Sequence, residues 1–160
     1  MNKSTLVATG LGVGAAAVAG SIASTPGRTG WYERLRKPRF QPPGFAFPLA
    51  WTTIYGDIAV SSAAAIDRLR AEGRDDEARR YAAALGLNLA LNAGWSWVFF
   101  RYQKLGPSAV GAVALWASSA DLARRTAQAD VRAGLAMSAY PAWCTFATYL
   151  ATEVWRLNRG

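Results

Sequence analysis

Tryptophan and asparagine are the residue types with the clearest chemical use in this 160-residue chain. Trp51, Trp95 and Trp143 lie in apolar segments, and Asn92 precedes Trp95 by three positions. Aromatic rings bind flat apolar molecules by stacking and burial, and a single amide can orient such a ligand. We therefore expect an apolar cavity walled by the three tryptophans, with Asn92 as its polar anchor. The alternative is a tryptophan belt at lipid headgroups, which fits Trp143 poorly because this residue lies about ten positions from either end of its segment.

Side chains that commonly carry catalysis or bind metals are scarce. Histidine is absent, and Cys144 is the single cysteine. This composition excludes a Ser-His-Asp triad, His-ligated haem, the usual zinc sites and an intrachain disulfide. We expect no metal site and no cofactor. Asp57 interrupts an apolar segment, where a carboxylate is costly, and would be the coupling group if the protein were a small-solute transporter.

The net charge of +8 points to an anionic partner, either nucleic acid or lipid headgroups. The basic residues form clusters between apolar segments that are too long for a small DNA-binding domain. Basic loops at lipid headgroups explain this pattern better, so we expect no nucleic-acid partner. Half of the 18 basic residues, Arg28 included, fall on each side of the expected spans. The orientation in the membrane is therefore not readable from the charge count.

Five apolar segments predict five transmembrane helices, over residues 5–23, 46–66, 80–101, 108–123 and 133–157. Together they make residues 1–160 a single all-α membrane domain. The first segment could instead be a cleaved signal peptide, but no polar region with a cleavage site follows it. Residues 102–107 are expected to form a turn, and Pro141 predicts a kink in the last helix.

The connector between the first two helices, Trp31 to Trp51, carries four of the seven prolines. Proline fixes φ and moves the preceding residue out of the helical region, so this stretch should be extended or turned. Its aromatic content argues against disorder. We expect a stiff, folded lid, in which the defining residues are Trp31, Lys37, Pro38, Phe40, Pro42 and Pro43.

Helical periodicity assigns faces to two of the segments. Positions i, i+4, i+7 and i+11 of the third segment form one stripe that should turn inward, namely Asn88, Asn92, Trp95 and Phe99. Small residues recur every four positions on the opposite side, where they suit contact with a second subunit, namely Ala82, Gly86, Ala90 and Gly94. The first segment carries the same spacing, which predicts close helix packing, at Gly10, Gly14, Ala16 and Gly20.

Taken in order, these motifs resemble the TspO/translocator protein family, whose members are also called tryptophan-rich sensory proteins or peripheral benzodiazepine receptors. The likeness covers nearly the whole chain. The residues that carry it are Trp31-Tyr32, Leu35, Lys37-Pro38, Phe40, Pro42-Pro43, Phe47-Pro48, Trp51, Tyr55, Leu91-Asn92, Trp95-Ser96, Phe99-Phe100, Trp143 and Phe146 to Leu150. The sequence departs from the family at Thr152, which replaces the tyrosine of a cholesterol-recognition segment, so we expect no particular sterol specificity.

This resemblance implies a five-helix membrane bundle, usually a homodimer, that binds porphyrins such as protoporphyrin IX and other hydrophobic ligands. It implies tetrapyrrole sequestration, sensing or transport by a multi-pass protein of the bacterial cell membrane. The third helix would supply the dimer contact, at Ala82, Gly86 and Ala90. The ligand-binding residues that it implies, with Phe99 added from the inward stripe, are Ala50, Trp51, Asn92, Trp95, Phe99, Trp143, Ala147 and Leu150.

Catalysis is the alternative to simple binding. Trp51 and Trp143 look like the two tryptophans that the family associates with light- and oxygen-dependent breakdown of protoporphyrin IX. The sequence offers no acid/base pair and no metal site, so such a reaction would depend on the excited porphyrin and these two side chains. We expect a binding protein, with porphyrin degradation as the enzymatic alternative.

Overall fold

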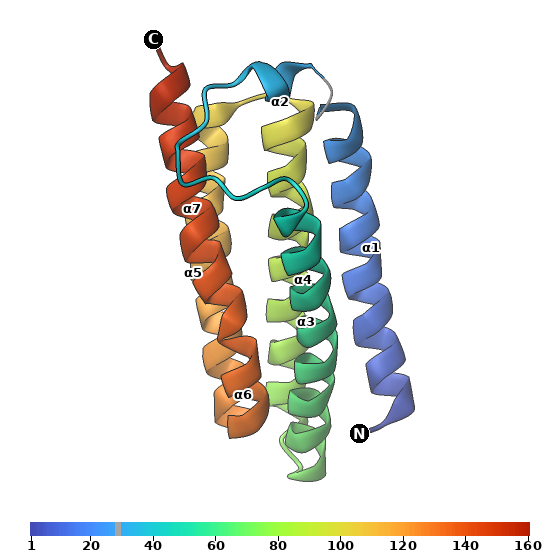
Figure 1. The fold of residues 1–160 in the computed structure, drawn as a ribbon. Helices are drawn as coiled ribbons and strands as arrows, with labels where there is room; N and C mark the ends of the chain where they lie inside the picture. The colour runs from blue at the N-terminus through green and yellow to red at the C-terminus, as the bar shows by residue number, and fades with distance from the viewer. Residues whose placement is uncertain (28–29) are drawn as a thin grey trace.

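The computed structural model describes residues 1–27 and 30–160, so Arg28 lies outside the described part. All regular structure in these two ranges is helical, which confirms the all-α prediction. Long helices stand side by side as a bundle, and the two termini lie at its opposite ends (Figure 1). The elements of the bundle are α1 (Lys3–Gly27), α3 (Ala46–Ala71), α4 (Asp75–Ser96), α5 (Leu105–Ala129), α6 (Val131–Met137) and α7 (Ala139–Asn158).

Charged residues extend two helices beyond the apolar segments that were used to predict them. Helix α3 continues from residue 66 to Ala71, where Arg68 pairs with Glu72 at 2.8 Å across one turn. Helix α4 begins at Asp75 rather than near residue 80, because acidic side chains in a first turn interact favourably with the helix dipole. The Arg74 guanidinium lies in the turn between them and holds the pKa of the Glu72 carboxyl below its usual value.

Helix α5 is also longer than the expected 108–123. The predicted turn at residues 102–107 is shorter, because α5 starts at Leu105 and contains Pro107 in its first turn. Proline is well tolerated there, since the N–H that it lacks would have no helical partner. The helix then runs to Ala129, and the Asp130 carboxylate accepts a hydrogen bond from the Ala133 amide at 2.9 Å to start α6.

The last span is broken, as Pro141 predicted. Helices α6 and α7 meet at Ser138, three residues before the proline. Pro141 has no N–H to donate to the carbonyl of Met137, so the helical ladder is interrupted at this position. Helix α6 forms the short first part of the span at the end of the bundle opposite the connector (Figure 1).

Close packing of α1 occurs at one of its two small-residue pairs. Ala16 is buried, and a side-chain carbon added at Gly20 would lie 3.3 Å from the Ser96 hydroxyl of α4. Gly10 and Gly14, in contrast, have nothing within 4 Å of such a carbon. Within this chain the predicted close approach is therefore found at Ala16 and Gly20, whereas Gly10 and Gly14 have no such neighbour among the described residues.

A five-residue π-helix, η1 (Trp97–Arg101), continues α4 at the connector end. The Tyr102 amide donates to the Trp97 carbonyl at 2.9 Å, one residue further than in an α-helix. Phe99 in this turn is only 4% exposed. By length and composition, two helical stretches in the described residues could cross a membrane, Lys3–Thr25 and Asp75–Arg101.

The connector begins with the single turn α2 (Trp31–Arg34) and then crosses the end of the bundle (Figure 1). The Lys37 ammonium folds back on this turn and donates to the carbonyls of Tyr32 at 2.7 Å, Glu33 at 3.2 Å and Leu35 at 3.3 Å. It also lies 4.7 Å from the centre of the Tyr32 ring. A cation at the carbonyl end of a helical turn is favourable, so Lys37 shapes the connector.

Helix α7 holds the connector at two places. The Asn158 amide accepts from the Arg36 backbone N–H and donates to the Arg36 carbonyl, both at 2.9 Å. Nearer the middle of the connector, Phe40 stacks on Tyr149 with ring centres 5.0 Å apart, and its edge meets Phe146 at 6.3 Å. These contacts fix a chain segment that has almost no regular structure of its own.

We predict that Asn158→Ala loosens the connector. Each lost hydrogen bond contributes about 1 kcal/mol, so local opening should increase roughly tenfold or more. Trypsin cleavage after Arg34, Arg36 or Arg39, followed in detergent micelles, should accelerate accordingly. Glu153→Gln on the same helix is the control, because within residues 1–27 and 30–160 the ion-pair partner of Glu153 is Arg156 and not a connector residue. Equal cleavage rates in Asn158→Ala and the control would contradict a clamping role.

Candidate functional site

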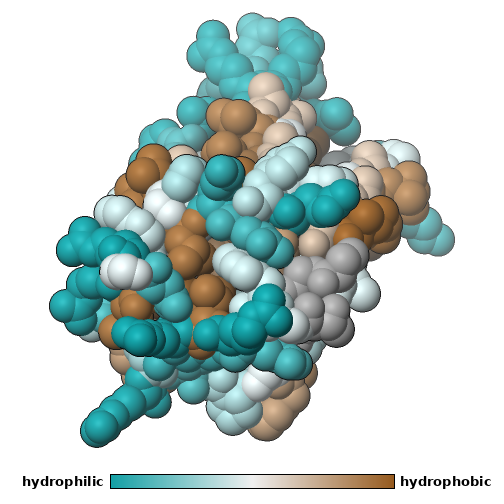
Figure 2. Space-filling model, turned by 90° about the horizontal axis from the view of Figure 1, so that it is seen from above, coloured by the Kyte–Doolittle hydropathy of each residue, from teal (hydrophilic) through white to brown (hydrophobic). Residues whose placement is uncertain are grey.

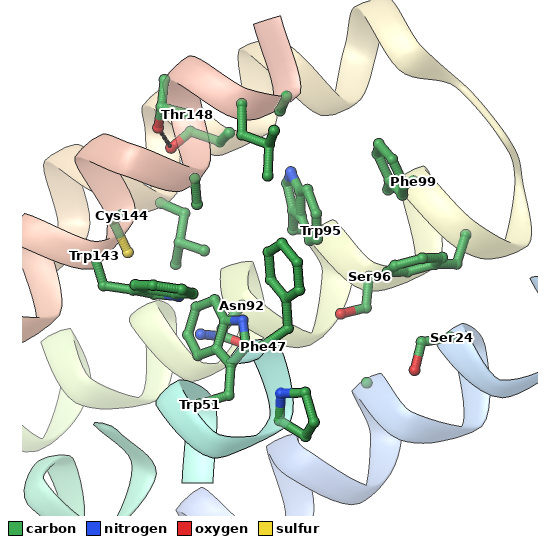
Figure 3. Close-up of a pocket in the computed structure, with 18 of the residues that line it drawn as sticks. Ser24, Phe47, Trp51, Asn92, Trp95, Ser96, Phe99, Trp143, Cys144 and Thr148 are labelled. Atoms are coloured by element: carbon green, nitrogen blue, oxygen red, sulfur yellow. Dashed lines mark hydrogen bonds between the residues drawn. The ribbon is translucent and has the colours of Figure 1, made fainter. Parts of the chain in front are cut away.

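A cavity of about 280 Å³ lies beneath the connector, between α1, α3, α4, α5 and α7. Its walls are mostly aromatic and aliphatic, and Figure 3 shows their rings converging from several helices. Such cavities bury flat hydrophobic ligands, whereas a few polar groups orient them. The described side chains that line it include Tyr32, Gln41, Phe47, Trp51, Tyr55, Asn92, Trp95, Ser96, Phe99, Phe100, Leu115, Trp143, Cys144, Ala147, Thr148 and Leu150.

Two tryptophans from different helices meet on one wall. The Trp51 ring of α3 and the Trp143 ring of α7 are perpendicular, with centres 6.4 Å apart. Phe47 meets the edge of Trp143 at 6.1 Å, and Tyr140 meets Trp51 at 6.3 Å. Edge-to-face pairs of this kind are favourable and limit the rotation of each ring. Trp51 and Trp143 therefore lie in direct ring contact, although 92 positions separate them in the sequence.

A second aromatic group closes the cavity below the connector. Trp95 and Phe99 stack with centres 5.1 Å apart and an angle of 16°. Trp31 contacts Phe99 at 5.7 Å, so the start of the connector is packed directly on η1, the continuation of α4. The Trp95 indole donates to the Ser108 carbonyl of α5 at 2.9 Å. The polar edge of Trp95 is thus bonded within the protein, and its ring remains on the cavity wall.

Asn92 forms part of a buried hydrogen-bond network at the cavity floor. Its carbonyl oxygen accepts from the Tyr55 hydroxyl at 2.8 Å, and its amide donates to the Tyr140 hydroxyl at 3.0 Å. Tyr140 in turn donates to Asn88 at 2.9 Å, and Asn88 donates to Ser118 at 3.1 Å. The network joins α3, α4, α5 and α7. Asn92 is therefore already engaged on both sides of its amide, so its first role is to hold Tyr55 and Tyr140.

Sequence reasoning found Asn88 and Asn92 through their helical spacing but gave Tyr140 no role. Tyr140 is fully buried and joins both asparagines. The pair of inward-facing asparagines could have indicated a polar partner on another helix, because a buried amide requires hydrogen bonds that apolar neighbours cannot supply. A tyrosine on another helix was one of the few side chains able to satisfy them.

Two side-chain polar atoms among the cavity residues are buried without a partner in the described structure. They are the side-chain amide oxygen of Gln41 and the indole N–H of Trp143. The other side of the Gln41 amide donates to the Tyr32 hydroxyl at 3.1 Å. A buried donor or acceptor without a partner costs about 1–3 kcal/mol, and a ligand with matching groups would recover part of this. Gln41 and Trp143 are thus better placed than Asn92 to meet polar atoms of a ligand.

The structure brings most of the predicted ligand-binding residues together. The ones that line the cavity are Trp51, Asn92, Trp95, Phe99, Trp143, Ala147 and Leu150. Ala50 is the exception, because it lies one position round α3 from Trp51 and is not among the lining residues. The six predicted lid residues belong to the connector but are not among the residues that line the cavity. The connector residues that do line it are Tyr32, Gln41, Gly44, Phe47, Pro48 and Trp51.

Asp57 lies away from this cavity, on the stretch of α3 below Tyr55. One of its carboxylate oxygens accepts from the Ser61 hydroxyl at 2.7 Å, and the other is buried without a described partner. It is not among the residues that line the cavity. The geometry therefore gives no support to Asp57 as a group that contacts a ligand there.

Positive charge is distributed differently at the two ends. Around the connector, Arg156 pairs with Glu153 at 2.8 Å, whereas no ion pair joins a described carboxylate to Arg34, Arg36 or Arg39. Seen from this end, polar side chains surround a strip of hydrophobic ones (Figure 2). At the opposite end, most arginines are paired, including Arg68, Arg74, Arg79, Arg124 and Arg125. The two ends were predicted to carry equal numbers of basic residues, but more of the positive charge lacks a described acidic partner at the connector end.

Comparison with known proteins agrees with this architecture. The chain matches the TspO/MBR family model over residues 6–156. It is 33% identical to Protein CrtK of Rhodobacter capsulatus over 151 residues, which covers 91% of this chain and 89% of that protein. It is 35% identical to a Tryptophan-rich sensory protein of Cereibacter sphaeroides over 128 residues, or 80% of this chain and 77% of the relative. The Translocator protein of Sus scrofa is 32% identical over 133 residues, with 81% and 76% covered.

The match to the family model spans all five long helical segments and the connector between α1 and α3. Family membership accounts for the ordered tryptophan and proline motifs. The chain belongs to the TspO/MBR family of integral membrane proteins, the tryptophan-rich sensory and translocator proteins.

Proposed function

We propose that the protein binds porphyrins, with protoporphyrin IX as the reference ligand, and related hydrophobic molecules in the cavity beneath the connector. The observation that carries this proposal is the wall on which Trp51 and Trp143 meet at 6.4 Å, opposite the stacked Trp95 and Phe99. Flat aromatic ligands gain affinity from stacking and from burial of apolar area. Such binding would serve tetrapyrrole sequestration, sensing or transport.

The composition favours a metal-free ring. The chain has no histidine, so an iron porphyrin would lack its commonest axial ligand. The Trp143 indole N–H and the Gln41 carbonyl oxygen would supply polar contacts to the ligand. Arg34, Arg36 and Arg39 carry no described ion pair and would be available to the carboxylates of propionate groups. Lys37 is committed to connector carbonyls and would not take that role.

The cavity is small for a tetrapyrrole, and this limits how such a ligand could bind. About 280 Å³ lies at the lower limit of sites for drug-sized ligands, which run from about 300 to 1,000 Å³. A tetrapyrrole would therefore enter only if the connector moved outward or if one edge of the ring remained at the cavity mouth. The connector is held by discrete contacts, chiefly those of Asn158 and Phe40, so its displacement would leave the helices intact.

We predict that the double variant Trp51→Phe/Trp143→Phe binds protoporphyrin IX at least tenfold more weakly than the wild type. Each substitution removes part of an aromatic contact of about 0.5–1.5 kcal/mol and some buried area. The measurement is a titration followed by porphyrin absorbance, which does not depend on the tryptophans that remain. Trp116→Phe is the control, because Trp116 is 41% exposed on α5 and does not line the cavity. An unchanged affinity in the double variant would remove the proposed site.

Light- and oxygen-dependent porphyrin degradation is the second candidate function, favoured by the direct contact between Trp51 and Trp143. Both rings line the cavity, so a porphyrin bound there would lie beside them when light excites it in the presence of oxygen. We predict faster bleaching of bound protoporphyrin IX in aerobic light than in anaerobic light, and a slower aerobic rate in Trp51→Phe/Trp143→Phe at equal occupancy. Bleaching at the same rate with and without the protein would exclude this activity.

We also propose a homodimer formed through α4, in the bacterial cell membrane, by analogy with the bacterial relatives. Ala82, Gly86 and Ala90 form an exposed stripe, and a carbon added at Gly86 meets nothing within 4 Å in the chain. Small residues allow helices of two subunits to approach closely.

The dimer proposal predicts that Gly86→Ile yields a folded monomer in detergent, because the added side chain would separate the two helices. Mass measurement by light scattering after gel filtration would check this. Gly56→Ile is the matched control, since Gly56 is an exposed glycine of α3 that also has open space around it. A Gly86→Ile protein that remains as dimeric as the wild type would overturn the α4 interface.

A further inference from the structure

A second, smaller cavity lies at the end of the bundle opposite the connector, where α3 ends, α4 begins and α5 ends. Its volume is about 100 Å³. At about 30 Å³ for each water molecule, it has room for roughly three waters, enough for a phosphate group but far too small for a tetrapyrrole. It is lined by Leu69, Arg74, Glu77, Arg80, Tyr81, Arg125, Gln128 and Ala129.

Two of its arginines keep free donors. Arg80 forms no ion pair with a described carboxylate, and Arg125 uses only its Nε, which donates to Asp121 at 2.6 Å. The acidic group of the cavity is already neutralised, because Glu77 receives two hydrogen bonds from Arg74 at 2.8 and 2.7 Å. The cavity therefore presents the two guanidinium groups of Arg80 and Arg125 to an anion. Guanidinium forks match phosphate oxygens in geometry as well as in charge.

The floor of the cavity is rigid and polar. Tyr81 is 1% exposed, and its hydroxyl lies within hydrogen-bond distance of Ser62 at 3.1 Å and of Thr126 at 2.7 Å. These bonds join α3, α4 and α5 directly below the arginines. The site is therefore built by three helices, with Arg74 of the short turn between α3 and α4 held at its edge by Glu77.

An apolar stripe leads from this cavity toward the middle of the bundle. Ala84, Leu87 and Leu91 follow Arg80 at i+4, i+7 and i+11, which places them on the same face of α4. Leu87 is 61% exposed. This face borders α5, because the neighbouring Asn88 bonds to Ser118 of that helix. The proposed dimer contact at Gly86 lies about 100° further round the same helix than Leu87.

We propose that this cavity binds the phosphate of an anionic phospholipid, with one acyl chain along the stripe from Ala84 to Leu91. Arg80 lies five residues into α4, about 8 Å along the helix axis from its start, which suits the headgroup level of a membrane-spanning bundle. Basic pockets between transmembrane helices at this level bind anionic headgroups. A free phosphate would satisfy the arginines equally well, but it would leave the exposed Leu87 side chain and the half-buried Ala84 and Leu91 beside it without a role.

The test is a calorimetric titration of the detergent-solubilised protein with dioctanoyl phosphatidylglycerol, with dioctanoyl phosphatidylcholine and inorganic phosphate as comparison ligands. We expect dioctanoyl phosphatidylglycerol to bind more tightly than either comparison ligand. Each guanidinium near a headgroup contributes about 1 kcal/mol, so Arg80→Gln should weaken this binding about fivefold and Arg80→Gln/Arg125→Gln about 25-fold. Arg80 has no described ion pair to lose, and Asp121 keeps its bond to Arg124 in the double variant, so both should fold.

The matched control is Arg79→Gln, which removes an exposed arginine of the same helix that pairs with Asp76 and does not line the cavity. Its lipid affinity should equal that of the wild type. Three results would overturn the proposal: an unchanged affinity in the double variant, an equal loss in Arg79→Gln, or inorganic phosphate binding as tightly as the lipid. The last result would reassign the cavity to a soluble anion. Thermal unfolding of each variant, followed by circular dichroism, would confirm that binding is compared between folded proteins.

Discussion

The buried network of Asn88, Asn92 and Tyr140 is the interaction on which the rest of the site depends. In the interior of a membrane bundle no bulk water is available, so each unpaired amide or hydroxyl would cost several kcal/mol. The network satisfies these groups only when α4 and α7 take one rotation relative to each other, because Tyr140 must reach both asparagines. That rotation brings Trp143 round to face Trp51. Polar pairing thus sets the position of the apolar walls.

The connector depends on the bundle more than on its own sequence. Its prolines remove backbone donors and restrict φ, which makes the segment stiff but does not decide where it lies. Its position is set by the Asn158 amide on Arg36 and by Phe40 on Tyr149. The same two contacts come from α7, the helix that also supplies Trp143. A movement of this part of the connector that enlarges the cavity must therefore change contacts with α7, so the roof can respond to a ligand while the floor stays fixed.

Periodicity and composition predicted the five spans, the break near Pro141 and the inward stripe that includes Asn92, because each follows from local chain properties. They made the helices too short at their ends, since charged residues such as Asp75 and Arg68 favour helix termini without adding hydrophobicity. The role of Tyr140 could not be predicted, because it depends on which residue of α7 meets α4. For the same reason, spacing alone identified Asn92 as a free anchor, whereas its amide is engaged within the protein.

The two cavities differ in the way that their charges are arranged. Beside the aromatic cavity, arginines of the connector stand without described carboxylate partners, so their field reaches outward and would attract an anionic amphiphile toward the mouth. At the opposite end most arginines are paired, and Arg80 and Arg125 line a cavity of about 100 Å³ with donors that no described carboxylate takes up. Long-range attraction suits a ligand that must be collected from dilute solution or from the membrane surface. The free guanidinium donors of Arg80 and Arg125 act over a short range in a small cavity. This arrangement suits a lipid headgroup, because headgroups are already abundant at that depth and the site needs only to prefer the anionic ones.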